Sequence, residues 1–187
     1  MLPGEASAIS YTTTRRPAIS PRRSKIHAAC MSNYRRAWIP GGTWFFTVAL
    51  ADRSQALLTE RVDALRAAYA WTRRRHPFET RAIVVLPEHL HVIWTLPDGV
   101  ADFSVRWKLI KEGFSRRLLC SEARSSSRVR QGERGIWQRR YWEHVIRDEE
   151  DLAAHISYVH GNPVKHGYVE RAADWRYSSI HRLAGGV

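Results

Sequence analysis

Two histidines separated by one residue are the first feature of this sequence that could do chemistry. They open the segment HLHVIWTL (89–96), which has the composition of a β-strand. Side chains alternate across a strand, so His89 and His91 share one face, with Cβ atoms about 7 Å apart. The opposite face is apolar and suits a core: Leu90, Val92, Trp94 and Leu96. Two imidazoles at this spacing can bind one cation, but two solvated histidines on an exposed sheet face would give the same pattern.

A polar stripe on the last predicted helix is the second feature. The pattern predicts a helix over 149–160, ended by Asn162-Pro163, with a buried side formed by Leu152, Ile156 and Val159. Along one flank, four polar residues follow at spacings of four, three and four: Asp151, His155, Tyr158 and Asn162. A phenol, an imidazole and an amide can thus address the same point. A single tyrosine is more often a packing or surface residue than a nucleophile, so the stripe alone leaves both interpretations open.

A third feature is the mixture of aromatic and basic residues in IWQRRYWEHVIR (136–147). Arginine binds phosphates and aromatic rings stack on unpaired bases, which together favour binding of single-stranded nucleic acid. The alternative is that Trp137, Tyr141 and Trp142 belong to the core and that the arginines are solvated.

The elements that would position these residues follow in a clear order. Strands are predicted over 44–50, 81–86, 89–96 and 141–147, with a turn at Pro87-Glu88. Helices are predicted over 59–75, with Thr59 as candidate N-cap, and over 103–118. The order βαββαβ, followed by the helix that carries the tyrosine, predicts an α+β, ferredoxin-like fold with an antiparallel sheet and helices on one face. Residues 1–30 are expected to form a basic disordered tail, 31–187 the domain, and 121–135 a mobile loop.

Composition narrows the classes of protein. The 187 residues carry a formal net charge of +12, which favours a polyanionic partner, nucleic acid rather than a membrane. No apolar stretch approaches the roughly 20 residues that cross a bilayer. Cys30 and Cys120 are isolated, which argues against a disulfide scaffold or a cysteine-zinc module and favours the cytoplasm.

Five segments together resemble a known family. They are NYRRAWIPGGTWFFTV (33–48), PEHLHVIW (87–94), IWQRRYWEHVIRD (136–148), YVHGNPVKHG (158–167) and DWRYSSIHR (174–182). In this order they are similar to the HUH single-tyrosine transposases, and most of all to the REP-associated tyrosine transposases, which act at repetitive extragenic palindromes. The resemblance covers about residues 31–183. The loop over 121–135 is longer than the family's usual connection, and residues 1–30 have no counterpart.

The resemblance implies an activity and a site. Tyr158 would be the nucleophile, His89, His91 and Asn162 would hold a divalent metal, and His155 would support these ligands. Such enzymes cleave single-stranded DNA beside a hairpin, forming a 5′-phosphotyrosine and freeing a 3′-hydroxyl. Oxygen ligands suit Mg²⁺ and imidazoles shift the preference towards Mn²⁺, so we expect one of these two ions. A monomer acting on the nucleoid is favoured over a dimer with shared sites.

Further residues are expected to contact the DNA: Arg35, Arg36, Trp137, Arg139, Arg140 and Lys165. Two other functions stay open on the residues alone. One is a non-catalytic module that binds single-stranded nucleic acid on its sheet. The other is a metal-dependent hydrolase in which the two histidines, with Asp151 or Glu88, activate a water.

Overall fold

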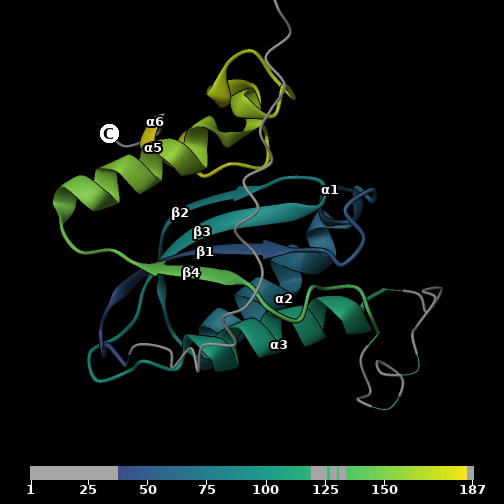
Figure 1. The fold of residues 1–187 in the computed structure, drawn as a ribbon, viewed down its shortest axis with the longest axis horizontal. Coiled ribbons are helices and arrows are strands. Elements are labelled where there is room, and N and C mark those ends of the chain that lie inside the picture. Colours follow the sequence, from purple (N-terminus) through teal and green to yellow (C-terminus); the bar gives the residue numbers. More distant parts are fainter. Residues whose placement is uncertain (1–37, 119–125, 127–129, 131–133, 185–187) are drawn as a thin grey trace, which may run out of the picture. The chain divides into compact units, whose positions relative to one another are not determined.

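Four strands form one antiparallel sheet in the computed structural model, which describes residues 38–118, 126, 130 and 134–184. The strands are β1 (Thr43–Ala49), β2 (Glu79–Val85), β3 (His89–Thr95) and β4 (Trp142–Val145), in the spatial order β2-β3-β1-β4 (Figure 1). Each strand runs antiparallel to its neighbours. This confirms the α+β class with an antiparallel sheet. The expected tail over 1–30, Arg35 and Arg36, and most of the expected loop over 121–135 lie outside the described residues.

The larger core lies on one face of the sheet, under α2 (Val62–Arg75) and α3 (Phe103–Arg116) (Figure 1). The apolar face of β3 supplies Leu90, Val92 and Trp94 to it, as the alternation predicts. The Trp94 ring stacks on Trp107 of α3, with centroids 4.3 Å apart. The Trp94 indole also donates a hydrogen bond of 2.7 Å to the hydroxyl of Tyr69 on α2. Packing on this face therefore fixes the register of β3 and the direction in which its histidines point.

The opposite face of the sheet is covered by α5 (Glu149–Lys165) (Figure 1). Val159 of α5 is fully buried in a smaller cluster with Phe45 of β1 and Ile93 of β3. The sequence-based expectation of helices on one face only is therefore incomplete. Because α5 lies over them, His89 and His91 are each only 4% exposed and are not solvated histidines on an open sheet.

The ends of α5 are set by side-chain and backbone caps. At its start, the Asp148 carboxylate accepts a hydrogen bond of 2.8 Å from the backbone N–H of Asp151. The predicted end at Asn162-Pro163 is wrong, because the helix continues through Pro163, which lacks an N–H but leaves the later N–H groups free to bond. The helix ends instead at Lys165, with His166 as its C-cap. Gly167, which follows the cap, has a φ of 73° that allows the closing bonds from Gly167 N–H to the Val164 carbonyl and from Tyr168 N–H to the Pro163 carbonyl.

Two further differences from the predicted elements are local. The first predicted helix is split into α1 (Leu57–Glu60) and α2 at Arg61, and Thr59 is not its N-cap, because the Thr59 hydroxyl donates to the carbonyl of Ala56. After α5 come a 3₁₀ turn, η1 (Ala172–Asp174), and α6 (Ile180–Ala184). No helix among the described residues is long and apolar enough to cross a membrane.

Candidate active site

A pocket of about 780 Å³ lies where α5 crosses the histidine-bearing face of the sheet. It brings together residues from β1, β3, β4 and α5 and from the segments beside them: Phe45, Thr47, Arg53, His89, His91, Trp142, Ala154, His155, Tyr158, Lys165 and His166. Of the residues predicted as ligands, nucleophile or support, His89, His91, Tyr158 and His155 line it, whereas Asn162 is not among its lining residues. Lys165, which was predicted to contact DNA, also lines it. The sheet and the helix therefore meet at one concave site.

The two histidines of β3 are held side by side, with ring centroids 4.8 Å apart. Nδ1 of His89 lies 2.9 Å from the Glu88 carboxylate, and Nδ1 of His91 lies 2.8 Å from the Thr47 hydroxyl. Among the described residues, no hydrogen bond of acceptable geometry involves either Nε2, although the Asn162 amide lies within reach of His91. A ring nitrogen that donates to a carboxylate or hydroxyl leaves the other with a lone pair for a cation, which is the usual support of a metal-binding histidine.

Burial keeps both imidazoles neutral. It lowers the pKa of His91 to about 3, with the nearby His89 and His166 acting in the same direction. The pKa of His89 is also lowered, mainly by burial, although the Glu88 carboxylate opposes the shift. A neutral imidazole is the form that binds a metal, so at neutral pH this pair needs to lose no proton before it can act as a ligand.

Asn162 completes a set of three potential ligands. It lies one helical turn beyond Tyr158 and is 1% exposed, and its Nδ2 approaches the Tyr158 carbonyl at 3.5 Å. The amide lies close enough to His91 to oppose part of the pKa shift, yet its buried Oδ1 forms no hydrogen bond of acceptable geometry with any described residue. A buried unsatisfied acceptor costs about 1–3 kcal/mol. A hard divalent cation would satisfy this oxygen, so the residues present fit such an ion.

Tyr158 projects from α5 against the histidine pair. Its ring meets that of His91 edge-on, with centroids 5.3 Å apart, and that of Phe45 at 5.9 Å. The residue is 41% exposed, so the side chain that packs beside His91 is also open to solvent. The Lys165 ammonium, two helical turns along, lies 5.0 Å from the centre of the Tyr158 ring. A phenol, two imidazoles and a cation thus converge on one place.

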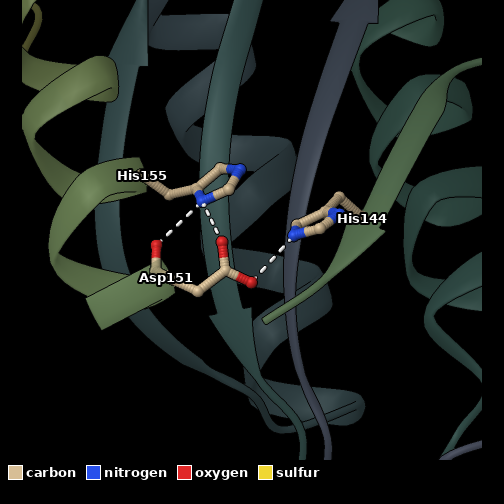
Figure 2. A group of neighbouring side chains, drawn as sticks. All are labelled: His144, Asp151 and His155. Atoms are coloured by element: carbon tan, nitrogen blue, oxygen red, sulfur yellow. Dashed lines mark hydrogen bonds and ion pairs between the residues drawn. The ribbon is translucent and has the colours of Figure 1, made fainter. Parts of the chain in front are cut away.

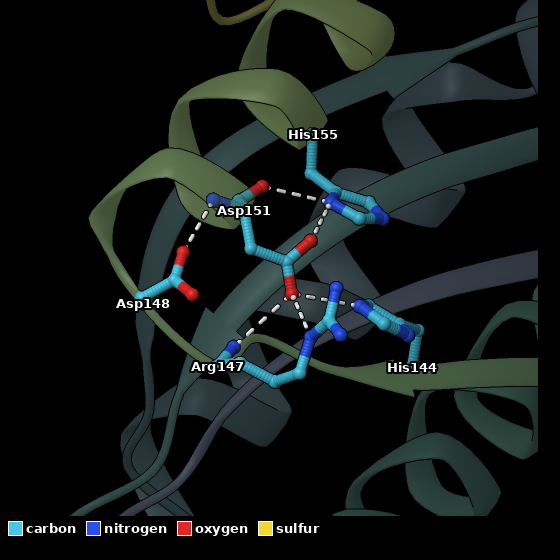
Figure 3. A network of polar contacts seen from close by, with 5 residues as sticks. All are labelled: His144, Arg147, Asp148, Asp151 and His155. Carbon is cyan, nitrogen blue, oxygen red and sulfur yellow. Dashed lines mark hydrogen bonds and ion pairs between the residues drawn. The ribbon is translucent and has the colours of Figure 1, made fainter.

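A hydrogen-bonded network adjoins the pocket where α5 begins (Figure 2). The Asp151 carboxylate lies 2.9 Å from Nε2 of His144 on β4 and 2.9 Å from Nδ1 of His155. It also accepts two hydrogen bonds from Arg147 (Figure 3). The hydrogen bond with His144 is the main reason that the pKa of Asp151 is lowered. Of the stripe predicted on this helix, Asp151 and His155 therefore bond each other, and Tyr158 and Asn162 approach the histidine pair.

Three side chains of this network have the ligand atoms that a cation requires. Their ligand atoms all lie within 4.8 Å of one another: His144, Asp151 and His155. However, the Arg147 guanidinium bonds the same carboxylate oxygen as His144, at 3.2 Å, and an incoming cation would have to displace it. With the carboxylate already satisfied by three neighbours, we interpret the cluster as a network that fixes the His144 and His155 rings.

The residues expected to bind DNA have different positions. Lys165 lines the pocket, and Arg139 and Arg140 are exposed just before β4. Trp137 is a correction: it is 9% exposed, packs in the larger core against Phe114 and donates to the Lys111 carbonyl, so its ring faces are not open to a base. The exposed tryptophan of this segment is Trp142.

Several pocket residues were not predicted. Trp142 lies on a predicted strand, which was a usable signal, but sequence alone did not say which face of that strand meets the site. Arg53 and His166 come from segments outside the strands, and no pattern marked them. Arg53 lies 3.0 Å from Glu88, and this hydrogen bond helps to outweigh burial and lower the pKa of the Glu88 carboxyl.

Comparison with known proteins places this chain. A scan against models of protein families finds no match. Among curated proteins, a REP-associated tyrosine transposase of Haemophilus influenzae is 49% identical over 154 residues, which cover 81% of this chain and 87% of that protein. One of Escherichia coli K12 is 48% identical, with 81% and 84% covered.

A solved structure agrees with these relatives. It is that of a REP-associated tyrosine transposase bound to a REP hairpin, which superposes with a TM-score of 0.71 at 48% identity over 83% of this chain and 87% of that one. At this identity and coverage, the resemblance seen in the five motifs is confirmed, and the chain belongs to the family of REP-associated tyrosine transposases.

Proposed function

We propose that this chain is a metal-dependent endonuclease and strand transferase that cuts single-stranded DNA beside palindromic hairpins through a covalent intermediate on Tyr158. The observation that carries the proposal is the position of Tyr158, edge-on to His91 at 5.3 Å and open to solvent. The REP hairpin bound by the related transposase supports hairpin-bearing DNA as the substrate. Repetitive extragenic palindromes on the nucleoid are the natural source of such strands.

The proposed first step consumes no cofactor. The Tyr158 hydroxyl gives up its proton to solvent as its oxygen attacks the scissile phosphorus. The P–O3′ bond breaks, and the freed 3′-oxygen takes up a proton from solvent, so the numbers of protons lost and gained are equal. The 5′-phosphate stays on Tyr158 as a phosphodiester, so a second 3′-hydroxyl can attack it, rejoin the strand and release the tyrosine. Because the bond energy is kept, the strand is rejoined without ATP.

The residues around Tyr158 have separate parts in this step. His89, His91 and Asn162 would hold Mg²⁺ or Mn²⁺, which when bound polarises the scissile phosphate and withdraws charge from it. Lys165 and Arg53 line the same pocket and attract the phosphodiester. Thr47 and Glu88 orient the two imidazoles through Nδ1. Holding phosphate and phenol in one pocket makes the attack effectively intramolecular.

Two finer structural inferences accompany this function. The order β1-α2-β2-β3-α3-β4 and the strand order β2-β3-β1-β4 support a ferredoxin-like domain to which α5 adds the tyrosine. Tyr158 packs edge-on against His91 of its own chain at 5.3 Å, which supports a monomer that needs no shared site.

The hydrolase alternative has weaker support. Its candidate carboxylates are already engaged: Glu88 by Arg53 and His89, and Asp151 by His144, His155 and Arg147. It also gives no role to the tyrosine beside His91. A pure binding module would not need two neutral imidazoles and an unsatisfied amide oxygen together.

The test is Tyr158→Phe, assayed with a hairpin-bearing single strand and Mn²⁺. We expect the wild-type chain to form a protein–DNA adduct that survives denaturant, and the variant to form none, because only the attacking oxygen is removed. Tyr168→Phe is the matched control: this tyrosine is 40% exposed, and its hydroxyl lies 3.4 Å from Glu88.

The outcomes separate the three functions. An adduct that persists in Tyr158→Phe contradicts the assigned nucleophile. Cleavage by the wild-type chain without any adduct indicates a hydrolase, and binding without cleavage in Mg²⁺ or Mn²⁺ indicates a binding module. Loss of the adduct in Tyr168→Phe alone would move the nucleophile to that residue.

A further inference from the structure

We propose that Trp142 is a stacking platform for an unpaired DNA base that adjoins the scissile phosphate, a proposal that rests on the function proposed above. The ligand class is a nucleobase of the single-stranded flank, recognised by its π-face. Trp142 is 55% exposed and lines the same pocket as the histidine pair and Tyr158. Packing in the core does not explain why so large an aromatic side chain is left exposed at the edge of this pocket.

The sheet register sets how far this platform lies from the reaction. Trp142 of β4 pairs with Thr47 of β1, and Thr47 pairs with His91 of β3. All three residues line the pocket, and two strand spacings separate Trp142 from His91, about 10 Å along the sheet. A phosphate held at His91 and a base resting on Trp142 would thus belong to the same nucleotide or to adjacent ones.

The Trp142 ring lies at the end of a set of near-parallel rings. Its plane is within 3° of that of His144, with centroids 5.9 Å apart, and His144 is within 14° of His155 at 4.7 Å. Phe45 meets the Trp142 ring edge-on at 5.5 Å. The His144 ring therefore lies parallel to the indole on one side, and a base on the side away from His144 would continue the same orientation.

The network around Asp151 holds this set of rings in place. Asp151 bonds both His144 and His155, and its position is fixed by Arg147 and by the Asp148 cap at the start of α5 (Figure 3). His144 is thereby prevented from turning away from Trp142. A platform whose orientation is already set loses little conformational entropy when a base stacks on it, which strengthens binding.

The charges nearby suit a strand that passes over the platform. Arg53 and Lys165 line the pocket on the histidine side, and Arg139 and Arg140 are exposed in the segment that leads into Trp142. Phosphates on either side of the stacked base would therefore meet cationic side chains. Stacking of this kind tolerates any base, so Trp142 would contribute affinity and position more than sequence readout.

The experiment measures DNA affinity in the full chain carrying Tyr158→Phe, with Mn²⁺ and a fluorescent hairpin that has single-stranded flanks. Trp142→Ala should weaken binding about 5- to 150-fold, the range for loss of one stacked base, while Trp142→Phe keeps most of the affinity. Trp38→Ala is the matched control, because Trp38 is also exposed, at 74%, but does not line the pocket. Unchanged affinity in Trp142→Ala would overturn the proposal.

Removal of single bases from the DNA locates the contact. We use oligonucleotides that each carry one abasic position. At one position next to the cleaved bond, the chain that keeps Trp142 should bind the abasic strand more weakly than the intact strand. Trp142→Ala should bind these two strands equally. Equal effects of Trp142→Ala on every oligonucleotide would contradict a specific stacking site. If Trp142→Ala does not fold, as judged by thermal unfolding, Trp142→Phe and the abasic series decide the question.

A failure of this proposal can be told apart from a failure of the proposed function. Adduct formation by the wild-type chain is measured separately and does not depend on the affinity series. A wild-type chain that forms the adduct while Trp142→Ala binds normally contradicts only the platform. A chain that forms no adduct but loses affinity at one abasic position contradicts only the proposed chemistry.

Discussion

At the scale of single residues, the proposed metal site depends on Asn162 and the two histidines. Nδ1 of each imidazole is engaged by a neighbour, which would leave Nε2 for a cation, and Asn162 Oδ1 is buried without a hydrogen bond of acceptable geometry among the described residues. A buried acceptor without a partner is unfavourable, so native proteins usually satisfy it with a hydrogen bond, a water or an ion. Two neutral nitrogens and one oxygen suit Mn²⁺, and Mg²⁺ if water completes its shell.

The role of Asn162 can be tested with two substitutions, one that removes the side-chain oxygen and one that keeps it. We expect Asn162→Ala to weaken Mn²⁺ binding by at least about tenfold, because the oxygen ligand is lost, and Asn162→Asp to retain binding, because an oxygen remains. Titration of Mn²⁺ followed by electron paramagnetic resonance measures both. If the alanine variant binds Mn²⁺ as tightly as the wild-type chain, Asn162 is not a ligand.

The buried state of His91 predicts a pH dependence of stability. Its pKa falls from an ordinary 6.5 to about 3 on folding, so between these values the unfolded chain binds more protons and the free energy of unfolding decreases as the pH falls. In metal-free buffer, His91 alone should cost about 2 kcal/mol between pH 7.5 and pH 5.

Urea unfolding of the wild-type chain and of His91→Gln at the two pH values isolates this contribution, since other groups titrate in both chains. We expect the loss of stability on acidification to be smaller in His91→Gln by about the same amount. An identical pH dependence in the two chains would show that His91 is protonated as readily when folded as when unfolded.

At the scale of elements, α5 decides the geometry of the site, because it brings Tyr158 and Asn162 over the face of β3. Its length depends on a cap that the sequence-based prediction placed too early. Pro163 was interpreted as the end of the helix, whereas the helix continues to Lys165 and Gly167, with φ of 73°, follows its cap. The extra residues keep Lys165 on the helix, where its ammonium lies over the Tyr158 ring.

Two glycines of this region give a matched pair. A Cβ at either Gly161 or Gly167 would meet nothing within 4 Å, so only the backbone conformation differs. We expect Gly167→Ala to destabilise the fold by about 1 kcal/mol, because alanine is strained at positive φ. Gly161→Ala, inside the helix, should stabilise it by about 0.5–1 kcal/mol. Urea unfolding measures both, and shifts of the same sign would contradict the assigned cap.

The elements themselves followed well from sequence, and their mutual contacts did not. The alternation in β3 correctly predicted which face carries Trp94 and which carries the histidines, and the helical spacing placed Tyr158 and Asn162 on one flank. Whether that flank meets the histidines depends on how α5 crosses the sheet, which a local pattern does not contain. For the same reason Trp137 was expected at the DNA, while the structure buries it and exposes Trp142.

At the scale of the whole molecule, the net charge and the similarity to known proteins both favour a nucleic-acid partner. A net charge of +12 favours a polyanion, and relatives 48–49% identical are REP-associated tyrosine transposases. The described part of the chain brings together the groups that the proposed cleavage and rejoining would use: a phenol, a pair of neutral imidazoles, an amide oxygen and surrounding cations. The central claim is that these groups act together, with Tyr158 as the residue to which DNA becomes attached.

The most direct measurement is the location of the covalent bond. The wild-type chain is incubated with a hairpin-bearing single strand and Mn²⁺, the adduct is digested with trypsin and nuclease, and the modified peptide is identified by mass spectrometry. The account predicts a 5′-linked nucleotide on Tyr158, in a peptide that also contains Asn162. A nucleotide linked to any other residue, or complete cleavage without a linked peptide, would contradict it.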